Sequence, residues 1–152
     1  MNLLIAPDSP ISADGRALIG ESQLALEAVY PPEEIFSFAA EELAVAGTDF
    51  LVARDAGGAA LGCVALVGCG SYGEVKRLFV RDGGRGRGVA KALMAALEAR
   101  AAARGLAEVR LETGARLRPA VRLYERLGYR SRGPFGAYVT HPASLFMEKS
   151  VA

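Results

Sequence analysis

The feature that most constrains the fold is a strand, a glycine-dense turn and a helix in direct succession. Residues 74–80 read Glu-Val-Lys-Arg-Leu-Phe-Val, and the β-branched and aromatic side chains favour a strand. Residues 81–88 follow with four glycines and three arginines. From Val89 onward, apolar residues recur every four positions, which predicts a helix. Regular alternation along the strand would place Lys76 and Arg77 on opposite faces of the sheet.

A turn of this kind between a strand and a helix is suited to bind an anion. The first N–H groups of a helix have no partner within it, and the helix dipole favours negative charge. Glycines let a phosphate approach the backbone, and arginines donate charge-assisted hydrogen bonds to phosphate oxygens. The predicted phosphate site comprises Arg85, Gly86, Arg87, Gly88, Val89 and Ala90. The alternative is a plain tight turn with solvated arginines.

The spacing of the glycines excludes two common nucleotide motifs. A dinucleotide fingerprint, Gly-x-Gly-x-x-Gly, would need a third glycine where the sequence has Val89 or Lys91. A Walker loop would need a lysine directly after the last glycine, where Val89 stands. The pattern that does fit is Arg-x-x-Gly-x-Ala, at Arg85, Gly88 and Ala90.

This loop resembles the pyrophosphate loop of the GNAT superfamily of N-acetyltransferases, which reads Gln/Arg-x-x-Gly-x-Gly/Ala after a similar strand. The resemblance implies that the loop amides hold the pyrophosphate of acetyl-coenzyme A. It also implies that the backbone of Leu78, Phe79 and Val80 binds the pantetheine arm. A backbone N–H of Leu78 or Phe79 would polarise the acetyl carbonyl.

A second segment, Leu123–Tyr129, resembles the GNAT pattern Leu-Tyr-x-x-x-Gly-Phe/Tyr. By this resemblance, Tyr124 contacts the cofactor and protonates the departing thiolate. The alternative role for Tyr124 is packing, since it shares a helical stripe with Val121. Many GNAT proteins have Asn or Gln near the start of this helix, where this chain has Arg118.

The attacking amine needs a base, because an alkylammonium with a pKa of about 10.4 must lose a proton first. Glu74, at the start of the strand, is the candidate base by resemblance to some GNAT enzymes, and a solvated strand-end carboxylate is its alternative role. Glu112 on the neighbouring strand, or a water chain, is the second choice. We expect direct attack without an acyl-enzyme, because neither Cys63 nor Cys69 lies where the family would need a nucleophile.

In this fold the acceptor pocket forms between the N-terminal helix pair and the loop before the last strand. The candidate acceptor-binding residues are Tyr30, Phe36, Phe135, Tyr138 and His141. Core packing explains Phe36 equally well, and a lone loop histidine is more often a surface residue. The resemblance implies a small-molecule primary amine as acceptor, with a protein N-terminus or lysine as second choice. The rival interpretation is a GNAT-fold module that binds the cofactor without catalysis.

Composition indicates one globular domain over residues 1–152. The net charge is +1, so the strongly basic face of a nucleic-acid-binding protein is not expected. There is no signal peptide pattern, and no apolar run approaches the roughly 20 residues of a membrane span. The two cysteines and single histidine form no metal motif, so we expect no metal and a reducing cytoplasm. A homodimer is compatible with the sequence.

Strand and helix signals along the chain follow the order β-α-α-β-β-β-α-β-α-β-β, which is also the GNAT order. The first helix is predicted to open at Ser12, and the second to run from Pro31 to Gly47. The expected fold is a mixed α/β single domain. Its central sheet would be mostly antiparallel, with about six to seven strands flanked by about four helices.

Overall fold

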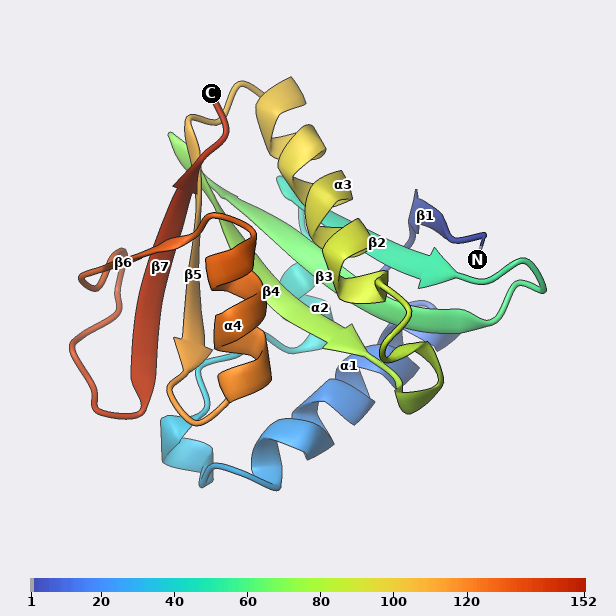
Figure 1. Ribbon diagram of the computed structural model, residues 1–152, viewed down its shortest axis with the longest axis horizontal. Helices are drawn as coiled ribbons and strands as arrows, with labels where there is room; N and C mark the ends of the chain where they lie inside the picture. Colours follow the sequence, from blue (N-terminus) through green and yellow to red (C-terminus); the bar gives the residue numbers. More distant parts are fainter. Residues whose placement is uncertain (1) are drawn as a thin grey trace.

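The structure, a computed structural model that describes residues 2–152, contains one seven-stranded sheet in the order β1-β2-β3-β4-β5-β7-β6 (Figure 1). The strands are β1 (Leu4–Pro7), β2 (Thr48–Arg54), β3 (Ala60–Cys69), β4 (Tyr72–Val80), β5 (Glu108–Gly114), β6 (Arg130–Arg132) and β7 (Ser144–Ser150). The α-helices are α1 (Ala13–Glu27), α2 (Ala40–Leu43), α3 (Val89–Ala103) and α4 (Arg118–Arg126). The predicted mixed α/β architecture and its element order are confirmed.

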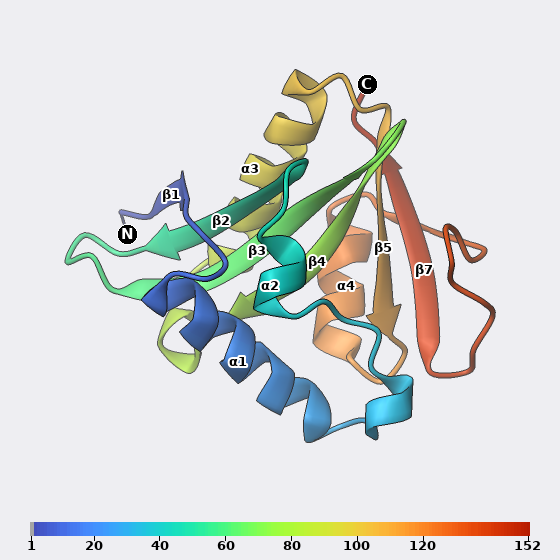
Figure 2. The same cartoon turned by 180° about the vertical axis from the view of Figure 1, so that it is seen from behind.

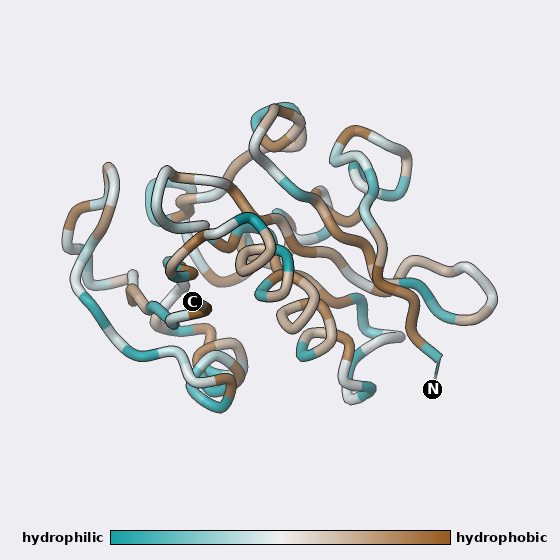
Figure 3. Tube along the Cα trace, turned by 90° about the horizontal axis from the view of Figure 1, so that it is seen from above, coloured by the Kyte–Doolittle hydropathy of each residue, from teal (hydrophilic) through white to brown (hydrophobic). Residues whose placement is uncertain are grey.

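Helices cover both faces of the sheet, with α3 and α4 on one face and α1 and α2 on the other (Figures 1 and 2). On the α3 face, Leu93 and Leu97 are fully buried in the larger core cluster. On the α1 face, Leu18, Leu43 and Phe50 form the second cluster. The apolar strands run through the middle of the molecule, and polar residues gather in the peripheral loops (Figure 3). Within residues 2–152, no helix is long and apolar enough to cross a membrane.

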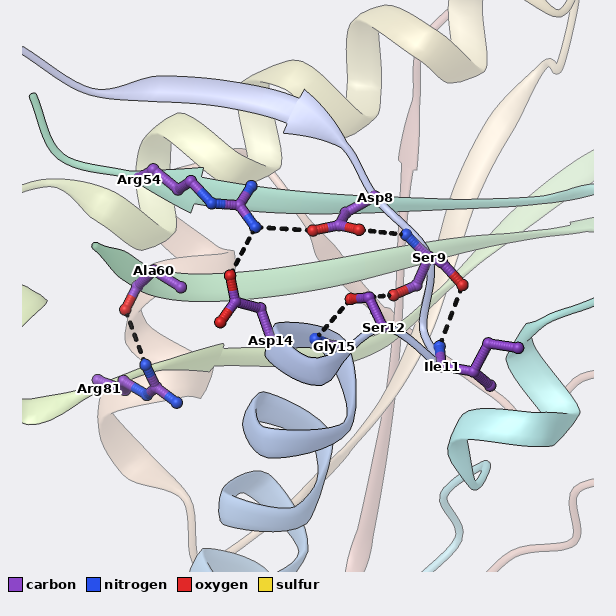
Figure 4. Close-up of polar contacts among 9 residues, drawn as sticks. All are labelled: Asp8, Ser9, Ile11, Ser12, Asp14, Gly15, Arg54, Ala60 and Arg81. Atoms are coloured by element: carbon purple, nitrogen blue, oxygen red, sulfur yellow. Dashed lines mark hydrogen bonds and ion pairs between the residues drawn. The ribbon is translucent and has the colours of Figure 1, made fainter. Parts of the chain in front are cut away.

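Polar contacts fix the start of α1 against the sheet (Figure 4). Ser12 caps the helix, because its hydroxyl accepts a hydrogen bond from the Gly15 N–H at 3.0 Å. Arg54 on β2 donates to the carboxylates of Asp8 at 2.7 Å and Asp14 at 2.8 Å. These contacts hold the first turn of α1 against β2.

The prediction of a second long helix from Pro31 to Gly47 is wrong. The segment contains a 3-10 turn, η1 (Pro32–Glu34), an extended stretch over 35–39, and the single turn of α2. Two of its carbonyl groups bond to cationic side chains of β4 in place of helical N–H groups. The Phe36 carbonyl accepts a hydrogen bond from Lys76 Nζ, and the Phe38 carbonyl accepts one from Arg77 Nε, both at 3.0 Å. Periodicity could not reveal this tertiary competition.

A bulge in β4 overturns the expected regular alternation. Arg77 has a φ of 56°, the one positive φ outside glycine within residues 2–152. The register with β3 shifts here, so that two residues of β4 oppose one of β3. Lys76 and Arg77 consequently both point toward the α1 face, where they contact Phe36 and Ser22 respectively. The bulge brings two cations to one side of the sheet.

After Glu74, just before the bulge, β4 and β5 diverge, as Figure 1 shows. Their parallel pairing covers only Tyr72–Glu74 of β4 against Glu108–Arg110 of β5. Residues 75–80 of β4 have β3 as their neighbour and no strand on the β5 side. Backbone polar groups on that side are therefore available to a ligand.

Candidate functional site

A cavity of about 490 Å³ opens where β4 and β5 diverge. Residues 75–80 of β4 form one wall, and Glu112, Thr113 and Gly114 of β5 contribute to the opposite one. The remaining lining comes from α1 and the segment after it, from the turn before α3, and from α4. These residues are Ser22, Ala25, Leu26, Tyr30, Glu34, Ile35, Phe36, Ser37, Arg85, Ala90, Leu117, Pro119, Ala120, Leu123 and Tyr124.

The turn before α3 offers a row of unpaired backbone donors. Within residues 2–152, the N–H groups of residues 86–91 have no hydrogen-bond acceptor, whereas the Arg85 N–H donates to the Asp82 carbonyl. Gly86 and Gly88 have φ values of 72° and 75°, and this conformation favours glycine. A β-carbon at either glycine would meet no atom within 4 Å, so the surface above them is open. These features fit a bound phosphate group.

The side chains of the predicted phosphate site divide into two groups. Arg85 and Ala90 line the cavity. The Arg87 guanidinium instead donates from Nη1 to the Gly83 carbonyl at 2.8 Å and so helps to hold the turn. Val89, the first residue of α3, is buried in the core. The side chains of Arg85 and Ala90 thus reach the cavity, whereas those of Arg87 and Val89 do not.

Tyr124 lies on α4 and lines the cavity although only 6 % of it is exposed. Its ring packs edge-on against Tyr129, with centroids 5.7 Å apart. Burial raises the pKa of the Tyr124 phenol far above its ordinary value, with the charge of Glu112 adding to the effect. The phenol therefore stays protonated near neutral pH and can donate a hydrogen bond.

Glu74 forms part of a buried ion pair at the base of the sheet. Lys76 Nζ lies 3.1 Å from Glu74 Oε2, and both side chains are more than nine-tenths buried. Tyr138, from the loop before β7, donates its hydroxyl proton to Glu74 Oε2 at 2.5 Å and accepts from Lys76. Burial and the Glu74 carboxylate both raise the pKa of Tyr138. Lys76 lines the cavity, whereas Glu74 does not.

Of the two candidate bases, Glu74 and Glu112, it is Glu112 that lines the cavity. It lies on β5, across the opening from β4. Burial raises the pKa of Glu112 above its ordinary value of 4.5, with a hydrogen bond from Ser144 acting in the opposite direction. A carboxylate with a raised pKa is a stronger proton acceptor than an exposed one.

The five predicted acceptor-binding residues occupy different environments. Tyr30 and Phe36 line the cavity, and Tyr30 accepts a hydrogen bond from the Arg116 N–H at 2.7 Å. His141 packs edge-on against Phe36 behind the cavity wall, with centroids 5.8 Å apart. Phe135 is buried against the rings of Tyr72, Tyr138 and Phe146, away from the cavity. Phe135, Tyr138 and His141 thus do not line the cavity. His141 packs against the lining residue Phe36, and Tyr138 bonds to the lining residue Lys76.

Sequence reasoning did not single out Lys76 or Glu34 among the residues lining the cavity. Glu74 and Lys76 stand two positions apart in a strand, so their side chains share a face of the sheet. Their opposite charges could therefore have indicated an ion pair. Their contact with Tyr138, more than 60 residues away, had no such signal in the sequence. Glu34 falls within the segment from Tyr30 to Phe38 that was expected to border the acceptor pocket, but a regular helix there gave no reason to single out its side chain.

We expect Tyr138→Phe to destabilise the protein by about 1–3 kcal/mol, because it removes one hydrogen-bond partner each from buried Glu74 and Lys76. Urea unfolding of the two proteins measures the difference. Tyr72→Phe is the matched control, since it deletes a hydroxyl in the same aromatic group outside the ion pair. Equal losses of stability in the two variants would show that the Tyr138 hydroxyl stabilises the protein no more than a hydroxyl outside the ion pair.

Comparison with known proteins places this cavity in a family. The family model described as "Acetyltransferase (GNAT) family" matches residues 16–129, which include the phosphate turn, the divergent strands and α4. The chain belongs to the GNAT acetyltransferase family. Members of this family use acetyl-coenzyme A as acetyl donor, and the predicted family assignment is confirmed.

Individual GNAT relatives agree over nearly the full length. A protein of Azospirillum brasilense named IAA acetyltransferase is 40 % identical over 97 % of each chain. A structure from Klebsiella pneumoniae, assigned by its name to the acyl-CoA N-acyltransferases, has a TM-score of 0.84 at 33 % identity, covering 99 % of this chain and 98 % of that one. PaiA N-acetyltransferase of Thermoplasma acidophilum, crystallised with coenzyme A, has a TM-score of 0.77 at 19 % identity over 99 % of each chain, which shows the shared fold.

Proposed function

We propose that this GNAT protein transfers the acetyl group of acetyl-coenzyme A to a primary amine of a small molecule by direct attack. The observation that carries the proposal is one cavity lined by Arg85 and Ala90, on either side of the open amides before α3, by the unpaired edge of β4, and by Glu112 and Tyr124. A binding site, a base and a proton donor thus share one space. The thioester of the cofactor supplies an activated acetyl group.

Two backbone features orient the cofactor in this proposal. The N–H groups of residues 86–91 bind the pyrophosphate, with Arg85 adding charge from the cavity wall. The free edge of β4 at Leu78, Phe79 and Val80 binds the pantetheine arm. A backbone N–H of Leu78 or Phe79 polarises the acetyl carbonyl, as an oxyanion hole does.

Glu112 accepts the proton of the acceptor amine in this proposal, and Tyr124 donates a hydrogen bond to the departing sulfur. A thiolate needs little assistance, because an ordinary thiol pKa is about 8.5. Direct attack agrees with the state of Cys63, which is fully buried and bonded through Sγ to the Arg77 carbonyl at 3.3 Å. Burial raises the pKa of Cys63 to about 12, so its nucleophilic thiolate is scarce.

We expect Glu112→Gln to lower kcat/KM for acetyl transfer by roughly 10²- to 10⁴-fold at neutral pH, as loss of a general base does. In the parent, kcat/KM should fall as pH drops through the pKa of Glu112, which burial raises above 4.5. This acid limb should vanish in the variant. Thiol release from acetyl-coenzyme A with a panel of primary amines, measured against pH, provides both readouts.

The stability of Glu112→Gln should change in the opposite direction to its activity. Folding raises the pKa of Glu112, so the folded state binds the proton more tightly, and the stability this gives is lost as pH rises through that pKa. Removing the buried charge should therefore raise the melting temperature at neutral pH. Glu74→Gln is the comparison, expected to lose stability yet keep the acid limb. A limb that disappears with Glu74 instead would make Glu74 the base.

A module that binds acetyl-coenzyme A without catalysis is the second candidate. It would bind the cofactor with the same turn but release no thiol with any amine in the panel. The cytoplasmic location, the homodimer, and a protein N-terminus or lysine as second-choice acceptor stay predictions from the sequence.

A further inference from the structure

The charged residues of the acceptor end of the cavity identify the class of amine. Four charged side chains line the cavity on the α1 side and across from it, namely Glu34, Lys76, Arg77 and Glu112. These side chains differ in how many of their hydrogen-bond donors and acceptors the protein itself already uses. An acceptor molecule is expected to satisfy what remains.

Most hydrogen-bond donors of the two cations are already engaged by the protein. An ammonium group has three donors, and Lys76 directs them to the Phe36 carbonyl, the Tyr138 hydroxyl and the Glu74 carboxylate. Arg77 directs three of its five N–H donors to the protein. They donate to the Phe38 carbonyl, Ser22 Oγ and Gln23 Oε1 at 3.0, 3.0 and 2.8 Å. Lys76 therefore has no donor left for an anionic acceptor, and the Arg77 guanidinium is held against α1 and the segment that follows it.

Glu34 is in the opposite state. Within residues 2–152 its carboxylate has no hydrogen-bond donor or ion-pair partner, and its Oε2 is the one buried side-chain nitrogen or oxygen atom without a partner. The residue lines the same cavity as Glu112, close in sequence to Ile35 and Phe36, which also line it. Burying a carboxylate oxygen without a donor is unfavourable unless a cation compensates for it.

We infer that the acceptor is dicationic, with Glu34 binding its non-reacting ammonium group while Glu112 serves the amine that is acetylated. This inference rests on the proposed function and adds the substrate class, a diamine. The apolar side chains of Leu26, Tyr30 and Ile35 line the same cavity and provide surface for the methylene chain of such a molecule. Glu34 is thus a specificity-determining residue.

The test compares acceptors of equal chain length. The probes are 1,4-diaminobutane, butylamine, 4-aminobutanol and 4-aminobutanoate, each with acetyl-coenzyme A. We expect kcat/KM to be highest for the diamine. Glu34→Gln should lower it roughly 10- to 100-fold for the diamine, as loss of one charge-assisted contact does, and should lower it far less for butylamine. Glu33→Gln is the matched control, because Glu33 is exposed in the same 3-10 turn.

Binding measured without chemistry separates this inference from the proposed function. Calorimetric titration of 1,4-diaminobutane into the protein saturated with coenzyme A should show binding that Glu34→Gln weakens and Glu33→Gln does not. That result supports the inference even if no thiol is released, in which case only the catalytic proposal fails. Diamine and butylamine binding equally well, or Glu34→Gln behaving like Glu33→Gln, would overturn the dicationic acceptor while leaving acetyl transfer intact.

Discussion

Gly88→Glu is expected to abolish acetyl-coenzyme A binding, with a loss of at least about 100-fold in affinity. The carboxylate would enter the open surface before α3, where the N–H groups of residues 86–91 are unpaired, and would repel the pyrophosphate. The new side chain meets no protein atom at its β-carbon, so the fold should tolerate it apart from the strain of a φ of 75°. Calorimetric titration with acetyl-coenzyme A measures the effect.

The chain provides a closely matched control in Gly105→Glu. Gly105 follows the C-terminal end of the same helix, also has a φ of 75°, and likewise has open space around a built β-carbon. The two variants carry the same backbone strain of about 1–2 kcal/mol and the same added charge. Only Gly88→Glu, at the N-terminal end of the helix, should lose acetyl-coenzyme A binding. If the parent does not bind acetyl-coenzyme A, or if both variants bind it equally, the turn is no pyrophosphate site.

The turn could be predicted from sequence because its properties are local. A strand, a glycine-rich connection and a helix N-terminus create anion-binding geometry wherever they occur, and all three are contiguous between Glu74 and Leu97. The order of strands and helices was equally readable from periodicity. The roles of individual side chains in the turn were not, because Arg87 bonds back to the Gly83 carbonyl rather than facing the cavity.

The acceptor side of the cavity was harder to predict because it depends on contacts distant in sequence. The segment over 35–39 is extended since two cations of β4 bond to its carbonyls, and those cations share a face only because β4 bulges at Arg77. Glu74 looked like an accessible base at a strand end, yet Lys76 and Tyr138 enclose its carboxylate. Bulges and buried ion pairs leave little trace in periodicity.

Lys76→Met is expected to destabilise the protein by about 3–5 kcal/mol, because it leaves the Glu74 carboxylate buried without its cation. Globular domains have total stabilities of roughly 5–15 kcal/mol, so this one change threatens the fold. The Phe36 carbonyl also loses its donor, so the extended segment over 35–39 should loosen. Urea unfolding at neutral pH measures the loss, and hydrogen exchange localises it.

Replacing the whole polar group separates the cost of an orphaned charge from the value of the ion pair. The triple variant Lys76→Met/Glu74→Leu/Tyr138→Phe removes both charges and the hydroxyl that joins them. We expect it to recover most of the stability lost by Lys76→Met alone, because apolar replacements of buried ion pairs are often neutral or stabilising. Recovery would mean that the ion pair is retained for the position it gives to the segment bearing Glu34 and Phe36. A triple variant as unstable as Lys76→Met would mean that the pair itself stabilises the fold.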